Sequence, residues 1–113
     1  MKYDLTMLRK LSDNDENFII DMLQTFKRTA PPVIARMEDY VAQHKMEATG
    51  REAHKLIPGV SFLGAKELED ILKIIEESCK TGEKIEQVPA LIVQAKTIVN
   101  ELITEFETDF HIP

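Results

Sequence analysis

Residues 51–65 read R-E-A-H-K-L-I-P-G-V-S-F-L-G-A, and the pattern around this stretch predicts the fold. Apolar and small side chains recur at steps of three and four residues, which is the period of one face of a helix. The stripe that they form consists of Met46, Thr49, Ala53, Leu56, Val60 and Leu63. This spacing predicts a helix over residues 46–63 with the stripe buried.

His54 lies within this predicted helix but outside its apolar stripe. Because it directly follows Ala53, it is rotated from the stripe by about 100°. Its own face of the helix carries Glu47, Gly50, Arg51, Ile57, Pro58 and Ser61. We therefore expect an imidazole whose base is packed and whose far nitrogen faces water, a geometry that suits contact with another macromolecule.

Two helices are expected before this one. The first is short, residues 5–11, with Asp4 as its N-cap. The second runs from the capping-box pair Asp13 and Glu16 to about residue 43. Pro31 and Pro32 interrupt it, but the apolar period continues across them, which favours one kinked helix over two separate ones.

Two more helices follow. One spans residues 66–81, between a left-handed Gly64 and a terminating Gly82. The last begins near Glu86, tolerates Pro89 in its first turn, and gives way to a frayed tail after Asp109. Their inward positions are predicted to be Leu68, Ile71, Leu72, Ile75, Cys79, Leu91, Ile92, Ala95, Ile98, Val99, Leu102 and Phe106.

Long amphipathic helices with short connections predict an all-α fold, an antiparallel up-down four-helix bundle with a short extra N-terminal helix. The 113 residues suit one domain, residues 1–113. In this bundle the hairpin of the third and fourth helices presents His54 on its outer side, near the middle of the wall.

Composition excludes several classes of function. The net charge of −6 offers no basic stripe for nucleic acid or for an anionic membrane. No apolar run approaches the roughly 20 residues that a transmembrane helix needs. Cys79 is the single cysteine, which indicates a reducing compartment, and we expect a cytoplasmic, monomeric chain. No phosphate-binding loop or kinase motif is present, so the chain cannot use ATP alone.

The segment A-H-K-L…L-G-A resembles the signature of histidine-containing phosphotransfer (HPt) domains, A-H-x-L-K-G-S…L-G-A. The matching positions are Ala53, His54, Leu56, Leu63, Gly64 and Ala65. The residues around Tyr3 to Phe18 are also similar to the family's usual lead-in, so the resemblance covers nearly the whole chain. It implies that His54 is phosphorylated by the aspartyl phosphate of a receiver domain and then phosphorylates another receiver.

The chain departs from that pattern just after the histidine. Ile57, Pro58 and Gly59 stand where the family usually has Lys, Gly and Ser. Without the lysine, we expect Arg51, and secondarily Lys55, to neutralise phosphate. Pro58 and Gly59 are expected to replace the usual small residues by bending the helix. The expected docking surface for a receiver comprises Gly50, Ile57, Pro58, Gly59, Ser61 and Phe62.

The resemblance also implies what the chain works with. Its partners would be response-regulator receiver domains, in other proteins or in the same polypeptide if the chain is the soluble C-terminal part of a membrane-bound hybrid sensor kinase. No cofactor or metal of its own is expected, because the receiver supplies Mg²⁺. Two alternatives stay open, namely a degenerate HPt-like bundle that docks a receiver without carrying phosphate, and a plain helical scaffold or dimerisation bundle.

Other polar residues are expected to be structural. His44 and His111 have no partners at metal-ligand spacing, and Cys79 reads as a small core residue. Glu76 and Glu77 read as a solvated helix face.

Overall fold

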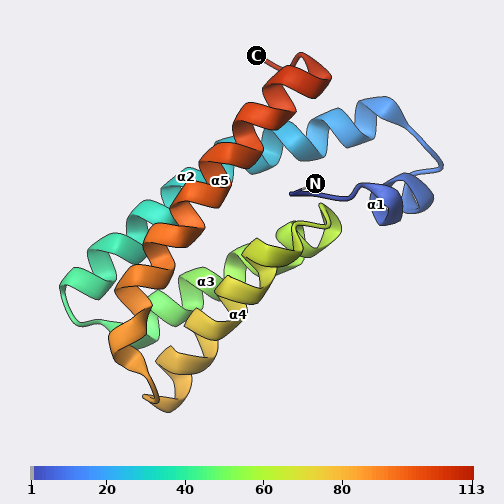
Figure 1. The fold of residues 1–113 in the computed structure, drawn as a ribbon. Coiled ribbons are helices and arrows are strands. Elements are labelled where there is room, and N and C mark those ends of the chain that lie inside the picture. The colour runs from blue at the N-terminus through green and yellow to red at the C-terminus, as the bar shows by residue number, and fades with distance from the viewer. Residues whose placement is uncertain (1) are drawn as a thin grey trace.

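Helices account for the architecture of residues 2–113, the part of the chain that the computed structural model describes (Figure 1). The elements in chain order are α1 (Thr6–Leu11), α2 (Glu16–Ala42), α3 (Met46–Phe62), α4 (Lys66–Thr81), the short 3-10 helix η1 (Ile85–Gln87) and α5 (Val88–Phe110). The predicted bounds of α4 are confirmed, and those of the other helices hold to within one or two residues.

The four long helices close into a bundle around one apolar core. Helix α3 packs against α2 and α4, and α5 completes the ring by packing against the same two helices. The bundle measures 42 × 24 × 21 Å. Side chains that are almost fully buried come from every long helix, among them Leu23, Met37, Val60, Leu72 and Phe106. The predicted all-α bundle with a short N-terminal helix is therefore confirmed, although Met46 and Leu91 lie half-buried at its margin.

The start of α2 differs from the prediction. The carboxylate of Asp15, not that of Asp13, accepts a hydrogen bond from the backbone N–H of Phe18 at 3.2 Å. Asp13 and Asn14 adopt left-handed backbone angles, with φ of 54° and 59°, so they form the turn that precedes the helix. The predicted cap was wrong because a helix can start only after the chain has left this turn.

Helix α2 continues through Pro31 and Pro32, as the uninterrupted apolar period predicts. Figure 1 shows its axis changing direction part-way along its length. Proline removes a backbone donor and crowds the carbonyl four residues earlier, which accounts for such a bend. Ala30, Val33 and Ile34 keep the inner face of the helix buried across the proline pair.

The chain before α1 is fastened to the turn between α3 and α4. Asp4 donates its backbone N–H to the carbonyl of Leu63 at 3.1 Å. Gly64 has φ of +63°, and a Cβ there would come within 2.1 Å of the carbonyl oxygen of Asp4. Only glycine fits this position, which is why the turn and the N-terminal segment can touch. The N-cap of α1 is Leu5 rather than the predicted Asp4, so that prediction was wrong. The carboxylate of Asp4, one residue earlier, accepts hydrogen bonds from the backbone N–H and the hydroxyl of Thr6.

The C-terminal tail is not frayed, so that prediction was wrong. Ile112 is buried, and Lys27 donates a hydrogen bond to the carbonyl of Pro113. His111 takes a left-handed conformation that ends α5 and returns the chain to the bundle. An apolar residue beyond the last turn favours this return because folding removes its side chain from water.

Candidate functional site

His54 lies on the outer side of α3, with 71% of its side chain exposed. The neighbouring stripe positions Ala53 and Leu56 are buried, so the predicted placement beside the stripe is confirmed. Helix α3 therefore fixes the base of the imidazole while leaving the ring open to a partner.

A close contact between α3 and α4 determines what lies opposite His54. A Cβ on Gly50 would lie only 2.9 Å from the Cβ of Cys79, so glycine allows the two helices to approach. One turn further along α3 comes His54, and one turn back along the antiparallel α4 comes Glu76. The contact thus places these two residues across from each other.

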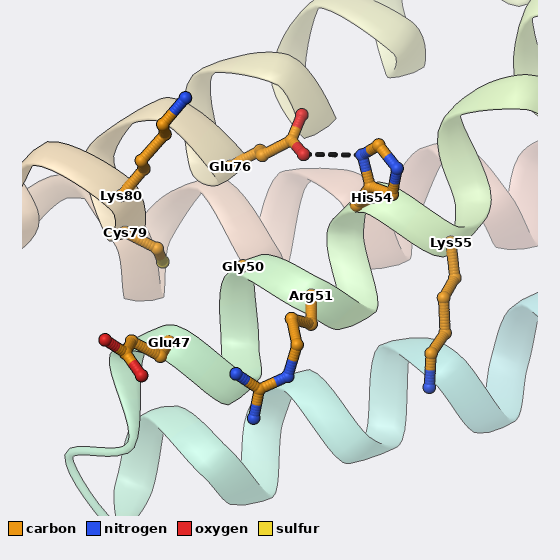
Figure 2. Close-up of a pocket in the computed structure, with 8 residues that line it drawn as sticks. All are labelled: Glu47, Gly50, Arg51, His54, Lys55, Glu76, Cys79 and Lys80. Carbon is orange, nitrogen blue, oxygen red and sulfur yellow. Dashed lines mark hydrogen bonds and ion pairs between the residues drawn. The ribbon is translucent and has the colours of Figure 1, made fainter.

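Glu76 holds the imidazole of His54. Nδ1 of His54 lies 2.6 Å from Oε2 of Glu76, and Figure 2 shows the two side chains pointing toward each other from α3 and α4. The expectation that Glu76 belongs to a solvated face was wrong, because the side chain is only 35% exposed and binds the ring.

This contact selects a tautomer. An ionised carboxylate can only accept a hydrogen bond, so a neutral imidazole bound to Glu76 carries its proton on Nδ1. The lone pair then lies on Nε2. The arrangement can therefore present a nucleophilic nitrogen at the surface of the bundle.

An open cavity of about 590 Å³ adjoins the imidazole between α3 and α4 (Figure 2). Gly50 and Cys79 contribute to its lining, and burial raises the pKa of the Cys79 thiol. The remaining lining residues are Glu47, Arg51, His54, Lys55, Glu76 and Lys80.

The two predicted phosphate-neutralising residues do not contact His54. Figure 2 shows the guanidinium of Arg51 and the ammonium of Lys55 pointing away from the ring. Nζ of Lys55 instead binds Oε2 of Glu52 at 2.7 Å. Lys80, on α4, is a further cation beside the cavity that the sequence did not single out.

The predicted docking residues differ in exposure. Pro58 and Phe62 are exposed, and Ile57, Gly59 and Ser61 are half-buried. Gly50 is buried against Cys79, so it can act only by setting the distance between the helices. Helix α3 is continuous through Pro58, which has no N–H to donate to the carbonyl of His54.

Comparison with known proteins decides the family. The model of the Hpt domain family matches residues 21–108. The chain belongs to the Hpt domain family. The crystal structure of histidine-containing phosphotransfer protein B (HptB) from Pseudomonas aeruginosa PAO1 superimposes on 96% of this chain and 93% of its own, with a TM-score of 0.86 and 25% identity. No curated protein sequence matches the chain.

Hpt domains are histidine phosphotransfer modules of phosphorelays and interact with receiver domains of response regulators. As an Hpt domain the chain is a phosphocarrier rather than an enzyme, and Hpt domains need no cofactor of their own. Between residues 2 and 113 no cluster of three His, Cys, Asp or Glu side chains could hold a metal ion. No helix in the same range has the length and apolarity to cross a membrane.

Sequence reasoning missed Glu76 because it lies on a different helix from His54. One signal could have found it. Gly64 and Ala65 form the turn between two antiparallel helices, and residues at about equal distance from such a turn lie opposite each other. His54 and Glu76 satisfy this relation, as do Gly50 and Cys79.

Proposed function

We propose that Nε2 of His54 accepts a phosphoryl group from the aspartyl phosphate of one receiver domain and passes it to the aspartate of another. The observation that carries this proposal is the exposed ring whose Nδ1 is bound by Glu76 at 2.6 Å, which leaves Nε2 free to attack. The two receivers belong to response regulators or to the polypeptide of a hybrid sensor kinase. The carrier works as a monomer.

The transfer step needs no cofactor bound to this chain, because one bond to phosphorus forms as another breaks. The Nε2 lone pair forms a bond to phosphorus while the bond from phosphorus to the aspartyl oxygen breaks, and the aspartate leaves as a carboxylate. The imidazole gains positive charge as the new bond forms, and the adjacent carboxylate of Glu76 stabilises that charge. Transfer to the second receiver reverses these steps. The receiver contributes Mg²⁺ and most of the charge stabilisation on the phosphoryl group.

Cations that line the cavity supply the positive charge that the family's usual lysine would provide at position 57. Within residues 2–113, neither Arg51 nor Lys80 forms an ion pair. Both side chains therefore remain available to bind the phosphoryl oxygens. Arg51 would have to turn toward the ring from its present position. A guanidinium can bind two phosphate oxygens at once, which favours Arg51 when the partner is docked.

The docking surface surrounds His54 on α3. Pro58 and Phe62 offer exposed apolar area, and the half-buried Ile57 and Ser61 adjoin the histidine's face. Pro58 cannot donate to the carbonyl of His54, so this oxygen lacks its usual hydrogen bond within the helix. Gly59 keeps local bulk low, since a Cβ there would meet nothing within 4 Å.

Incubation with a phosphorylated receiver tests the proposal. We expect acid-labile, alkali-stable label on the wild-type chain and none on His54→Gln, while His44→Gln serves as the matched histidine control. Binding of the receiver without label would identify a degenerate module that docks only. Neither binding nor label would indicate a scaffold.

A further inference from the structure

A buried carboxylate lies two positions before His54. Glu52 is only 5% exposed, yet it is charged. Oε1 accepts from Nε of Arg36 on α2, and Oε2 accepts from Nζ of Lys55, both at 2.7 Å. Burial by itself would raise the pKa of this carboxyl, but the hydrogen bonds from Lys55 and Arg36 outweigh it and hold the pKa below its usual value. One anion is therefore shared between two cations.

The two cations are not equivalent. Arg36 joins Glu52 to a neighbouring helix. Lys55 directly follows His54 in the chain, and 60% of its side chain is exposed. Ion pairs with an exposed partner contribute little, because water and salt screen them. If Lys55 leaves, Glu52 keeps its bond to Arg36, so no unpaired charge remains buried.

Phosphorylation would create a competitor for Lys55. A phosphoryl group carries close to two negative charges, whereas Glu52 carries one charge that Arg36 already partly neutralises. The flexible four-carbon stem of lysine allows its ammonium to move between adjacent sites on one helix. Ile57 stands where the family usually has a lysine. Lys55, which directly follows His54, is the cation nearest to it in sequence.

We propose that Glu52 holds Lys55 away from His54 in the unphosphorylated chain and yields it to the phosphoryl group once His54 is modified. Glu52 is then a positioning residue that acts through Lys55. Its competition limits how strongly the phosphorylated state is stabilised, which keeps the group transferable to the next receiver. This inference rests on the proposed phosphorylation of His54.

The test is a double-mutant cycle on the equilibrium between a phosphorylated receiver and the full chain. Glu52→Gln should raise the equilibrium fraction of phosphorylated chain, with the equilibrium constant increasing about three- to tenfold, because Lys55 is no longer held by a charge. Lys55→Met should lower the constant by a similar factor. The double variant should match Lys55→Met alone, since Glu52 has no effect without the lysine.

Two controls separate this role from a purely structural one. Lys66 and Asp70 form an exposed ion pair on α4, so Lys66→Met and Asp70→Asn should leave the equilibrium unchanged. Far-UV circular dichroism checks that Glu52→Gln keeps its helices. An effect of Glu52→Gln that persists in the Lys55→Met background would overturn the inference, as would a folded Glu52→Gln chain with an unchanged constant. An unlabelled wild-type chain would instead refute the proposed function itself, and the inference with it.

Discussion

At the scale of single residues, the site depends on how one carboxylate is placed relative to one imidazole. Glu76 binds Nδ1 of His54 and so leaves the lone pair on Nε2. Loss of a group that orients a metal-ligating histidine typically costs about 10–100-fold in activity. We expect a similar loss here, because without Glu76 the ring samples the other tautomer and other orientations.

Glu76→Ala should therefore slow phosphoryl transfer to the chain by about 10–100-fold, measured as the initial rate of label loss from a phosphorylated receiver. Glu76→Gln should fall between the wild type and the alanine variant, since its amide oxygen can still accept from Nδ1 but carries no charge. The neighbouring, exposed Glu77 provides the matched control, and Glu77→Ala should transfer at the wild-type rate. Equal rates for Glu76→Ala and the wild type would show that the contact has no role in transfer.

The sequence predicted one half of this site. Periodicity alone placed His54 beside the buried stripe, because neighbouring residues on a helix are separated by a fixed rotation. It did not place Glu76, because that contact depends on how α4 packs against α3. It also did not single out the pair of Lys55 and Glu52, although a spacing of three residues on one helix allows that contact. Glu52 is a charged residue on a buried position, which no apolar pattern predicts.

At the scale of helices, the most extensive packing is between α3 and α4. Gly50 is the residue that permits it, since a Cβ there would lie 2.9 Å from the Cβ of Cys79. Gly59, on the same helix, has no atom within 4 Å of the corresponding position. The two glycines therefore allow the same substitution to be compared with and without a steric neighbour.

Gly50→Ala should destabilise the chain by about 1–2 kcal/mol, because overpacking at the helix contact exceeds the roughly 1 kcal/mol that alanine gains over glycine in a helix. Gly59→Ala should stabilise it by about 0.5–1 kcal/mol. Chemical denaturation measures both. Gly50→Ala should also slow phosphoryl transfer, since α4 carries Glu76 away from His54 when the helices separate. A Gly50→Ala chain as stable as Gly59→Ala would contradict the assigned contact.

Helix bounds were predictable because their signals are local. Gly64 and Gly82 adopt the left-handed angles expected of residues after a helix, and the apolar period identified each buried face. The error at Asp13 arose because capping requires extended backbone, while Asp13 and Asn14 share a left-handed turn. The capping-box spacing indicated Asp13 because Glu16 lies three residues after it, whereas Asp15 has Phe18 at that position.

At the scale of the whole molecule, both ends of the chain pack against the bundle. The hydroxyl of Tyr3 donates a hydrogen bond to Oδ2 of Asp109 at 2.5 Å, and its ring packs edge-on against Phe106. Burial, reinforced by that hydrogen bond and by the charge of Asp109, raises the pKa of Tyr3 to about 12. The tail after Asp109 was wrongly predicted to be frayed because its own contacts, such as the hydrogen bond from Lys27 to Pro113, also join residues far apart in sequence.

The hydrogen bond from Tyr3 to Asp109 should contribute less to stability at alkaline pH. The folded-state pKa of Tyr3 is about 12, above the ordinary value of 10.0, so its contribution to stability is complete below pH 10 and is lost as pH rises toward 12. The difference in unfolding free energy between wild type and Tyr3→Phe should therefore shrink by about 1 kcal/mol from pH 8 to pH 11. Comparing the two chains cancels the titration of lysines. A difference that does not change with pH would show that Tyr3 is not held by Asp109.

The buried thiol of Cys79, between α3 and α4, can be used to measure local opening of the helix hairpin. Cys79 is 7% exposed at the lining of the cavity beside His54, so a maleimide reacts with it faster when the helix hairpin opens. The labelling rate at neutral pH would then report how often the thiol becomes accessible in the resting carrier. Repeating the measurement with a receiver bound would reveal whether docking tightens or loosens the scaffold beneath the histidine.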